Sequence, residues 1–413
     1  MIALTTLPNR VRIVTETIPS VRSISFGIWV NNGGRHENPQ NSGISHFLEH
    51  MFFKGTHKRT ALEIADTMDA VGGQLNAFTS KEATCYFVRI LDTHFDIALD
   101  VLSDMFFNSK FDPAEIDKER NVILEELNMY EDTPDDLVGE LLHEKMYPGH
   151  PLGMPILGTK ATIESFTQDS FLDLIKNRYT PENIVVAVAG NFDQNEIVEK
   201  ITAIFGQITG QAAPLDIPSP IYTPSFATKD KDIEQVHLAM GLPGIAAGTD
   251  ESYALAAVNT IFGGGMSSRI FQKIREEHGL VYSVYSYPLN YMDTGALMIY
   301  AALNPSNLQD AISLLAEEAR GMLTNKINDT QLYNVKEQLK ASFLLSLEST
   351  SSRMNSLGRS VLMLDRVITT DELIQKIDQV DMAQFYDICD RVFRLDQTSI
   401  ALVGKNVPEI KIS

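Results

Sequence analysis

The chain has 413 residues, of which 44% are hydrophobic, and this length predicts two domains or two similar halves instead of one core. A formal net charge of −20 at pH 7 argues against binding to nucleic acid, whose phosphates would be repelled. The apolar runs are short and interrupted by charge, so no membrane span is expected, and the stretch "MIALTTLPNRVRIV" does not read as a secretory or transit peptide.

The cysteine content indicates a compartment. Cys85 and Cys389 lie far apart in the sequence, and two such residues do not make a disulfide framework. A reducing cytoplasm is therefore the expected location.

The first half alternates predicted strands and helices. Stretches rich in β-branched and aromatic residues predict strands at 11–16, 23–30, 72–80, 83–91 and 183–191. Apolar periodicity and capping residues predict helices at 42–54, 60–71, 92–108, 112–147, 162–177 and 193–205.

A proline-bearing stretch at 206–225 cannot form a helix or a central strand and predicts an extended linker. Beyond it, strands are expected at 233–243, around 281–303 and at 399–406, with helices at 250–262, 305–323 and 328–347. The late stretch "SIALVGKN" resembles the earlier "VVAVAGN", which indicates a duplicated α/β unit. The expected division is an N-terminal domain at 1–208, a linker at 209–228 and a C-terminal domain at 229–413.

The stretch "GISHFLEHMFFKGT" (43–56) carries the strongest chemical signal. On a helix, His46, Glu49 and His50 share one face, so both imidazoles can reach a single zinc ion while the glutamate holds a water beside it. Asn41 or Ser42 could cap the start of this helix. The alternative is a half-buried helix with incidental polar residues, but this residue order is the inverted zinc-peptidase signature.

A catalytic zinc usually has a third protein ligand, often a carboxylate. The predicted helix 112–147 offers Glu119, Glu125 and Glu126. Glu119 and Glu126 are two helical turns apart and share a face, from which Glu125 is offset.

These motifs resemble the inverzincins, the family that includes pitrilysin, insulin-degrading enzyme and the mitochondrial processing peptidases. The likeness covers essentially the whole chain and is nearest to short bacterial processing-peptidase-like forms. It implies an α+β fold of two similar halves, each a mostly antiparallel sheet packed with helices, forming half of a clam-shell chamber. It further implies His46, His50 and Glu126 as zinc ligands, Glu49 as general base and Glu119 as a supporting residue that orients a ligand histidine.

The stretch "GGQLNAFTS" (72–80) is predicted to be an edge strand that pairs with an extended peptide, with Gly72 and Gly73 leaving room for another backbone. An ordinary hairpin strand is the alternative. The family resemblance implies that Asn76, Ala77 and Phe78 bind substrate, which would favour short or unfolded polypeptide segments.

The second half has no matching histidine motif, since "ESYALAAVNTIF" (251–262) lacks histidine, so one zinc per chain is expected. The resemblance implies that Arg275 and Tyr282, seven residues apart, steady the substrate carbonyl from a partner chain, which predicts a homodimer. A heterodimer with an inactive paralogue is the alternative. The glycine turn at 263–265 is shorter than the glycine-rich loop of the processing peptidase's non-catalytic subunit.

Asp136 and Glu140 would form one acidic face on the helix that carries Glu126. The resemblance implies that they engage a basic substrate residue near the cleavage site, and the alternative is a solvated surface.

Three functions compete at this point. The first is a zinc endopeptidase acting on peptides or extended polypeptide. The second is a non-catalytic partner subunit, which would have lost ligands that His46, Glu49, His50 and Glu126 retain. The third is a zinc hydrolase of small molecules, which a peptide-binding edge strand disfavours.

Overall fold

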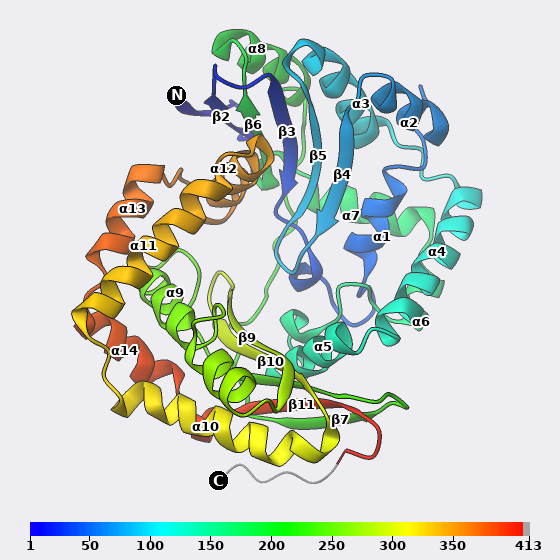
Figure 1. Cartoon of the computed structure of the whole chain (residues 1–413). Coiled ribbons are helices and arrows are strands. Elements are labelled where there is room, and N and C mark those ends of the chain that lie inside the picture. The colour runs from blue at the N-terminus through cyan, green and yellow to red at the C-terminus, as the bar shows by residue number, and fades with distance from the viewer. Residues whose placement is uncertain (408–413) are drawn as a thin grey trace. The chain divides into compact units, whose positions relative to one another are not determined.

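The computed structural model describes residues 1–407, which form two compact units, each built around its own sheet (Figure 1). Unit 1 contains residues 1–127, 154–217 and 344–368. Unit 2 contains residues 128–153 and 218–343 and the chain from Thr369 onward. Each unit packs helices on a mainly antiparallel sheet, so the expected α+β fold with two similar halves is confirmed.

The sheet of unit 1 consists of β1 (Ile2–Thr6), β2 (Arg12–Thr17), β3 (Ser23–Val30), β4 (Gln74–Thr79), β5 (Thr84–Leu91) and β6 (Ile184–Gly190). Their order is β1-β2-β6-β3-β5-β4, and every neighbouring pair is antiparallel except β2 with β6. β3 and β6 are apolar along nearly their whole length, so they form the buried centre, while β4 lies at an edge.

Helices cover both faces of this sheet. α12 (Thr350–Leu364) packs on β2, β3 and β6, where Met354 lies against Trp29. The main core lies on the opposite face, against α1 (Ile44–Met51), α2 (Ala61–Asp69), α3 (Phe95–Asn108), α4 (Pro113–Glu131), α6 (Lys160–Ser165), α7 (Gln168–Arg178) and α8 (Gln194–Phe205).

Unit 2 contains β7 (Phe226–Asp230), β8 (Val236–Pro243), β9 (Val281–Asn290), β10 (Gly295–Leu303) and β11 (Ser399–Gly404), in the order β7-β11-β8-β10-β9. Its main core joins this sheet to α9 (Glu251–Phe262), α10 (Leu308–Thr324), α11 (Asp329–Ser346) and α14 (Met382–Val392), and α13 (Thr370–Gln379) contacts α9. The other face of the sheet is covered by α5 (Pro134–Met146).

Each unit therefore receives one helix from the other half of the sequence. α12 follows most of the second half yet belongs to unit 1, and α5 precedes the linker yet belongs to unit 2. Both sheets have two apolar faces, and these two helices bury the second face. The expected ranges 1–208 and 229–413 assign α5 to the N-terminal domain and α12 to the C-terminal domain, whereas in the structure each helix belongs to the other unit. Residues 207–225 form neither helix nor strand, as expected for a linker, and β7 begins within the last part of the range 209–228.

The prediction of a single helix at 112–147 is wrong, because the structure has two helices there, α4 and α5. Pro134 lacks an amide hydrogen and disfavours helical geometry in the preceding residue, and Thr133 is accordingly extended, with φ −109° and ψ 92°. Asp136 and Glu140 consequently lie on α5 in unit 2, not on the helix that carries Glu126 in unit 1.

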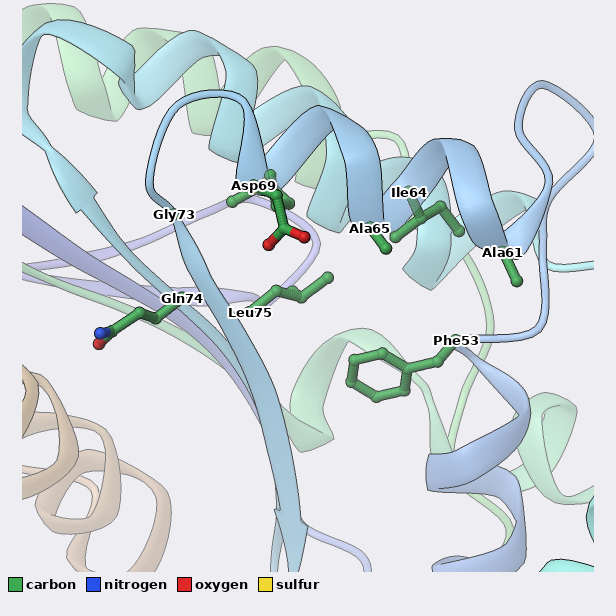
Figure 2. Close-up of a pocket in the computed structure, with 9 residues that line it drawn as sticks. Phe53, Ala61, Ile64, Ala65, Asp69, Gly73, Gln74 and Leu75 are labelled. Atoms are coloured by element: carbon green, nitrogen blue, oxygen red, sulfur yellow. The ribbon is translucent and has the colours of Figure 1, made fainter.

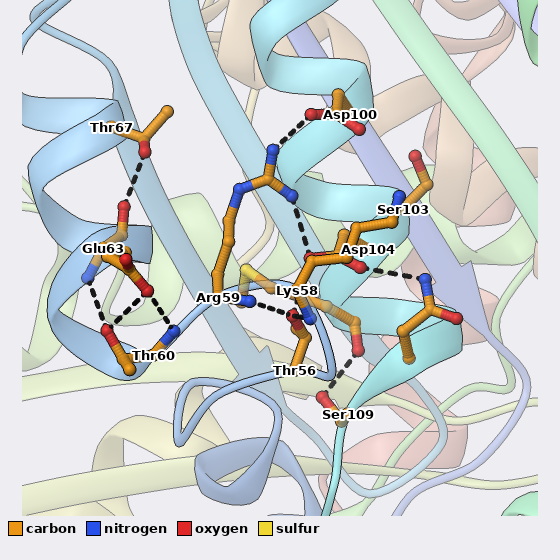
Figure 3. A network of polar contacts seen from close by, with 12 residues as sticks. Thr56, Lys58, Arg59, Thr60, Glu63, Thr67, Asp100, Ser103, Asp104 and Ser109 are labelled. Carbon is orange, nitrogen blue, oxygen red and sulfur yellow. Dashed lines mark hydrogen bonds and ion pairs between the residues drawn. The ribbon is translucent and has the colours of Figure 1, made fainter.

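Side-chain hydrogen bonds connect the turn after α1 to α3 (Figure 3). Gly55, four residues after the end of α1, has φ +104°, a left-handed conformation that favours glycine. The Thr56 hydroxyl donates to Asp104 at 2.7 Å, and the Arg59 guanidinium donates to Asp104 at 2.8 Å and also to Asp100. These bonds fix the C-terminal end of α1 relative to the core.

Candidate active site

Three potential metal ligands converge from two helices of unit 1. His46 and His50 lie one turn apart on α1, and Glu126 comes from α4. The Glu126 Oε2 atom is 3.8 Å from His46 Nε2 and 3.6 Å from His50 Nε2, and the three ligand atoms all lie within 4.8 Å of one another. Ligand atoms of a tetrahedral zinc site are roughly 3.3 Å apart, so small side-chain movements would close this cluster around an ion.

The surroundings of the two imidazoles suit a metal. Burial, followed by the nearby charge of His50, lowers the pKa of His46 to about 3, so its ring is neutral at pH 7. The buried Nδ1 atom of His46 has no hydrogen-bond partner among the described residues. The Nδ1 atom of His50 instead donates to Glu119 Oε1 at 2.8 Å, which leaves its Nε2 lone pair directed toward Glu126.

Glu119 is a buried carboxylate behind His50. Its other oxygen, Oε2, is 2.5 Å from the Lys54 ammonium. Burial raises the pKa of Glu119, but the hydrogen bonds from His50 and Lys54 outweigh burial and hold that pKa below its usual value. An ionised Glu119 fixes both the ring orientation and the tautomer of His50. Lys54 was not anticipated, although it follows the motif by only four residues.

The start of α1 differs from the expected cap at Asn41 or Ser42. Gly43 occupies the N-cap position with φ +90°, and the buried carboxylate of Glu37 accepts from the amides of Gly43 at 2.7 Å and Ser45 at 2.9 Å. A carboxylate here satisfies free amides and opposes the positive end of the helix. The apolar residues between the ligands pack into the core and fix the helix rotation, so the histidines face Glu126.

Glu49 lies on the same face of α1 and contacts the edge strand. The Thr79 hydroxyl of β4 donates to Glu49 Oε2. Burial raises the pKa of Glu49 above its usual value, and the hydrogen bond from Thr79 and the nearby His50 lower it only partly. Thr79 was not anticipated, although its spacing from Ala77 places both residues on one face of β4.

β4 pairs only with β5 among the described residues, so its outer edge can accept another strand. Asn76 is exposed and its side chain accepts from the amide of Ala77 at 2.8 Å. Phe78 lies on the same face of β4 as Asn76, opposite to Ala77 and Thr79, and its ring is 5.4 Å from that of Trp29. A Cβ on Gly73 would lie 2.4 Å from the Met68 methyl group, so a larger residue there would displace the end of that side chain.

An apolar pocket lies beside the start of this strand (Figure 2). Its volume is about 490 Å³, and it lies between α2 and β4. Phe53 and Leu75 point toward it from one side, and Ile64 and Ala65 of α2 from the other.

Arg275 and Tyr282 come together in unit 2. The Arg275 Nε–H donates to the carbonyl of Tyr282 at 3.1 Å, and its guanidinium lies 4.9 Å from the ring centroid of Phe271. The Tyr282 side chain lies on the edge strand β9 and is 78% exposed. In the same unit, burial and then the neighbouring Asp135 raise the pKa of Asp136.

Comparisons with known proteins identify the family. A model described as insulinase (peptidase family M16) matches residues 12–160, and one described as the peptidase M16 inactive domain matches residues 165–339. The protein YmxG of Bacillus subtilis, named as an uncharacterized zinc protease, is 44% identical over 404 residues and 98% of each chain. A Streptomyces coelicolor protein named in the same way is 41% identical over 384 residues, which cover 91% of this chain and 84% of that one.

Solved structures share the fold. The crystal structure of a protease from Helicobacter pylori has a TM-score of 0.90 at 21% identity and covers 98% of this chain and 99% of its own. A structure from Pseudomonas fluorescens, described as a peptidase M16 inactive domain, has a TM-score of 0.92 at 17% identity and covers 99% of each chain.

The chain belongs to peptidase family M16, the insulinase family, and its relatives are named zinc proteases. This confirms the family expected from the histidine motif. None of the helices within residues 1–407 is both long and apolar enough to cross a membrane.

Proposed function

We propose that the chain is a zinc-dependent endopeptidase that cleaves peptides or extended polypeptide segments. The convergence of His46, His50 and Glu126, with the carboxylate of Glu49 beside them, carries this proposal. In it, the first three residues hold one zinc ion and Glu119 orients His50. When bound, zinc lowers the pKa of a water toward 7 and polarises the scissile carbonyl.

The chain's own groups then move the proton. Glu49 accepts a proton from the attacking water and later passes it to the leaving amine. Its buried carboxylate, held by Thr79, is directed by the same strand that receives the substrate. An acid–base residue that is hydrogen-bonded to the substrate-binding strand is held in a fixed position relative to the bound peptide.

The substrate is proposed to add to the free edge of β4, beside Asn76, Ala77 and Phe78. Main-chain pairing selects extended segments, and the pocket next to Leu75 offers space for an apolar side chain. Asp136 and Glu140 remain proposed contacts for a basic residue, now from α5.

Two chains are proposed to form a homodimer, with Arg275 and Tyr282 of the partner steadying the carbonyl oxygen in the transition state. The exposed Tyr282 ring and the donor-rich Arg275 suit this role. A weakly active member of a heterodimer is the second candidate. Cys85 and Cys389 are free thiols, which fits the proposed cytoplasmic location.

The function is tested by zinc analysis together with cleavage of a quenched peptide. Wild type should contain one zinc per chain, cleave the peptide and lose activity with a chelator. Glu49→Gln should keep the zinc and lose hydrolysis, because the amide cannot accept the proton. Full activity of Glu49→Gln would refute the assigned role.

A further inference from the structure

The end of α7 contains a buried arginine without a carboxylate partner. Arg178 is only 8% exposed, and its Nη2 atom donates to the carbonyl of Asn31 at 2.6 Å. Its buried Nε atom has no hydrogen-bond partner, and no carboxylate within residues 1–407 forms an ion pair with it. Arg35, buried to the same degree, is paired with Glu82 at 2.7 Å. A buried guanidinium stays charged, so Arg178 lacks the counter-charge that Arg35 has.

Arg178 lines a pocket of about 440 Å³ in unit 1, away from the residues assigned above to zinc and substrate. The pocket lies between the start of α1, the end of α7 and the linker. Ala213 of the linker closes one side, and its amide donates to the carbonyl of Asn177 at 3.2 Å.

The polar groups around this pocket offer mainly donors. His36 accepts the Gly33 amide at Nδ1, and its pKa is lowered to about 3 by burial and then by Arg178, so the neutral ring carries its hydrogen on Nε2. The side-chain oxygens of Asn38 and Asn41 accept backbone amides at 2.9 and 2.6 Å, which leaves their NH₂ groups as donors. The exposed Asp173 is the one carboxylate in the lining.

The remaining wall is apolar. Ile44, Phe166, Leu174 and Leu215 line the pocket beside the donors. The volume also exceeds what a single inorganic ion fills. A ligand with a negative head group and a short hydrocarbon body would satisfy both surfaces.

We propose that this pocket binds a small organic oxyanion, whose carboxylate or phosphate group meets Arg178 and the His36 Nε2–H. The apolar part of the ligand lies against Ile44 and Phe166. The bound anion supplies the counter-charge that the fold omits, and the linker residues beside it hold it in place.

The test compares thermal unfolding of the zinc-loaded protein in acetate, hexanoate, phosphate and chloride at matched ionic strength. The melting temperature should rise with hexanoate or phosphate and not with chloride, because a ligand of the folded state stabilises it. Hexanoate should act at lower concentration than acetate because of the apolar wall. A larger response to phosphate than to hexanoate would identify a phosphate head group.

Asn41→Asp is the decisive variant. The aspartate keeps the oxygen that accepts the Asn38 amide but replaces the NH₂ donor with a carboxylate oxygen, so the anion response should disappear. Asn328→Asp is the matched control in unit 2, where the side-chain oxygen accepts the Gln331 amide at 2.9 Å, and it should respond like wild type. Arg178→Met should also lose the response.

An equal response in wild type and Asn41→Asp would overturn the proposal, since it would indicate binding elsewhere, including at the zinc. The absence of any response in wild type would overturn it as well.

Discussion

At the residue scale, the carboxylate of Glu49, the proposed base, accepts a hydrogen bond from the Thr79 hydroxyl. This bond favours the ionised carboxylate against the burial that disfavours it. Removing the hydroxyl therefore raises the pKa of Glu49 further. At a given pH a smaller fraction of the base is ionised, so the loss of activity on acidification begins at a higher pH than in wild type.

Thr79→Val should lower kcat by about tenfold, the effect of losing one hydrogen bond to a charged group. It should also move the acidic limb of the kcat/KM profile to higher pH, with the zinc content unchanged. Thr67→Val is the control, because among residues 1–407 that hydroxyl bonds only to the Glu63 carbonyl within α2. A Thr79→Val profile that overlays wild type would contradict the positioning role.

The residues of the candidate site differ in how far the sequence could predict them. Helix periodicity alone places His46, Glu49 and His50 on one face. Choosing Glu126 over Glu125 needed the family resemblance, and in the structure Glu126 reaches both histidines whereas Glu125 is exposed. The contact of Thr79 with Glu49 depends on how β4 lies against α1, which no local pattern encodes.

At the element scale, the placement of α1 depends on a left-handed glycine. A Cβ on Gly43, at φ +90°, would lie 2.5 Å from the carbonyl oxygen of Leu157. Gly43→Ala should therefore cost about 2 kcal/mol or more of folding free energy. It should also weaken zinc binding, because α1 carries both histidines.

The measurement is calorimetric unfolding with zinc titration. Gly139→Ala is the control, since Gly139 lies inside α5 with nothing within 4 Å of an added Cβ. That change should stabilise by about 0.5–1 kcal/mol. Wild-type stability and zinc affinity in Gly43→Ala would show that the close approach is not required.

The ends and the number of the helices could be predicted only in part from local sequence patterns. The apolar and acidic pattern of 112–147 runs through Thr133 and Pro134, yet the chain ends one helix there and begins another that packs on a different sheet. α12 was not expected at all. α12 is buried against Trp29, which lies in a strand more than 300 residues earlier in the chain. This contact cannot be predicted from the composition of α12 itself.

At the scale of the whole molecule, the proposed dimer predicts complementation between two inactive chains. Glu49→Gln keeps Tyr282, and Tyr282→Phe keeps Glu49. If each site combines the zinc of one chain with Tyr282 of its partner, mixed dimers contain one intact site. The mixture, exchanged under mild dissociating conditions, should therefore cleave peptide that neither variant cleaves alone.

Co-purification of untagged Tyr282→Phe with affinity-tagged Glu49→Gln from the same mixture establishes that mixed dimers form. If they form and the mixture stays inactive, Tyr282 does not act across chains. A fully active monomer at assay concentration would exclude the shared site more directly.

The proposed function depends most on the binding of one zinc ion by three side chains from two helices. Diffraction from zinc-loaded crystals at the zinc absorption edge locates that ion without reference to activity. One anomalous peak per chain is predicted, bonded to His46 Nε2, His50 Nε2 and a Glu126 oxygen at about 2.0–2.2 Å. A peak at another position, or one that lacks the glutamate, would contradict the proposed centre.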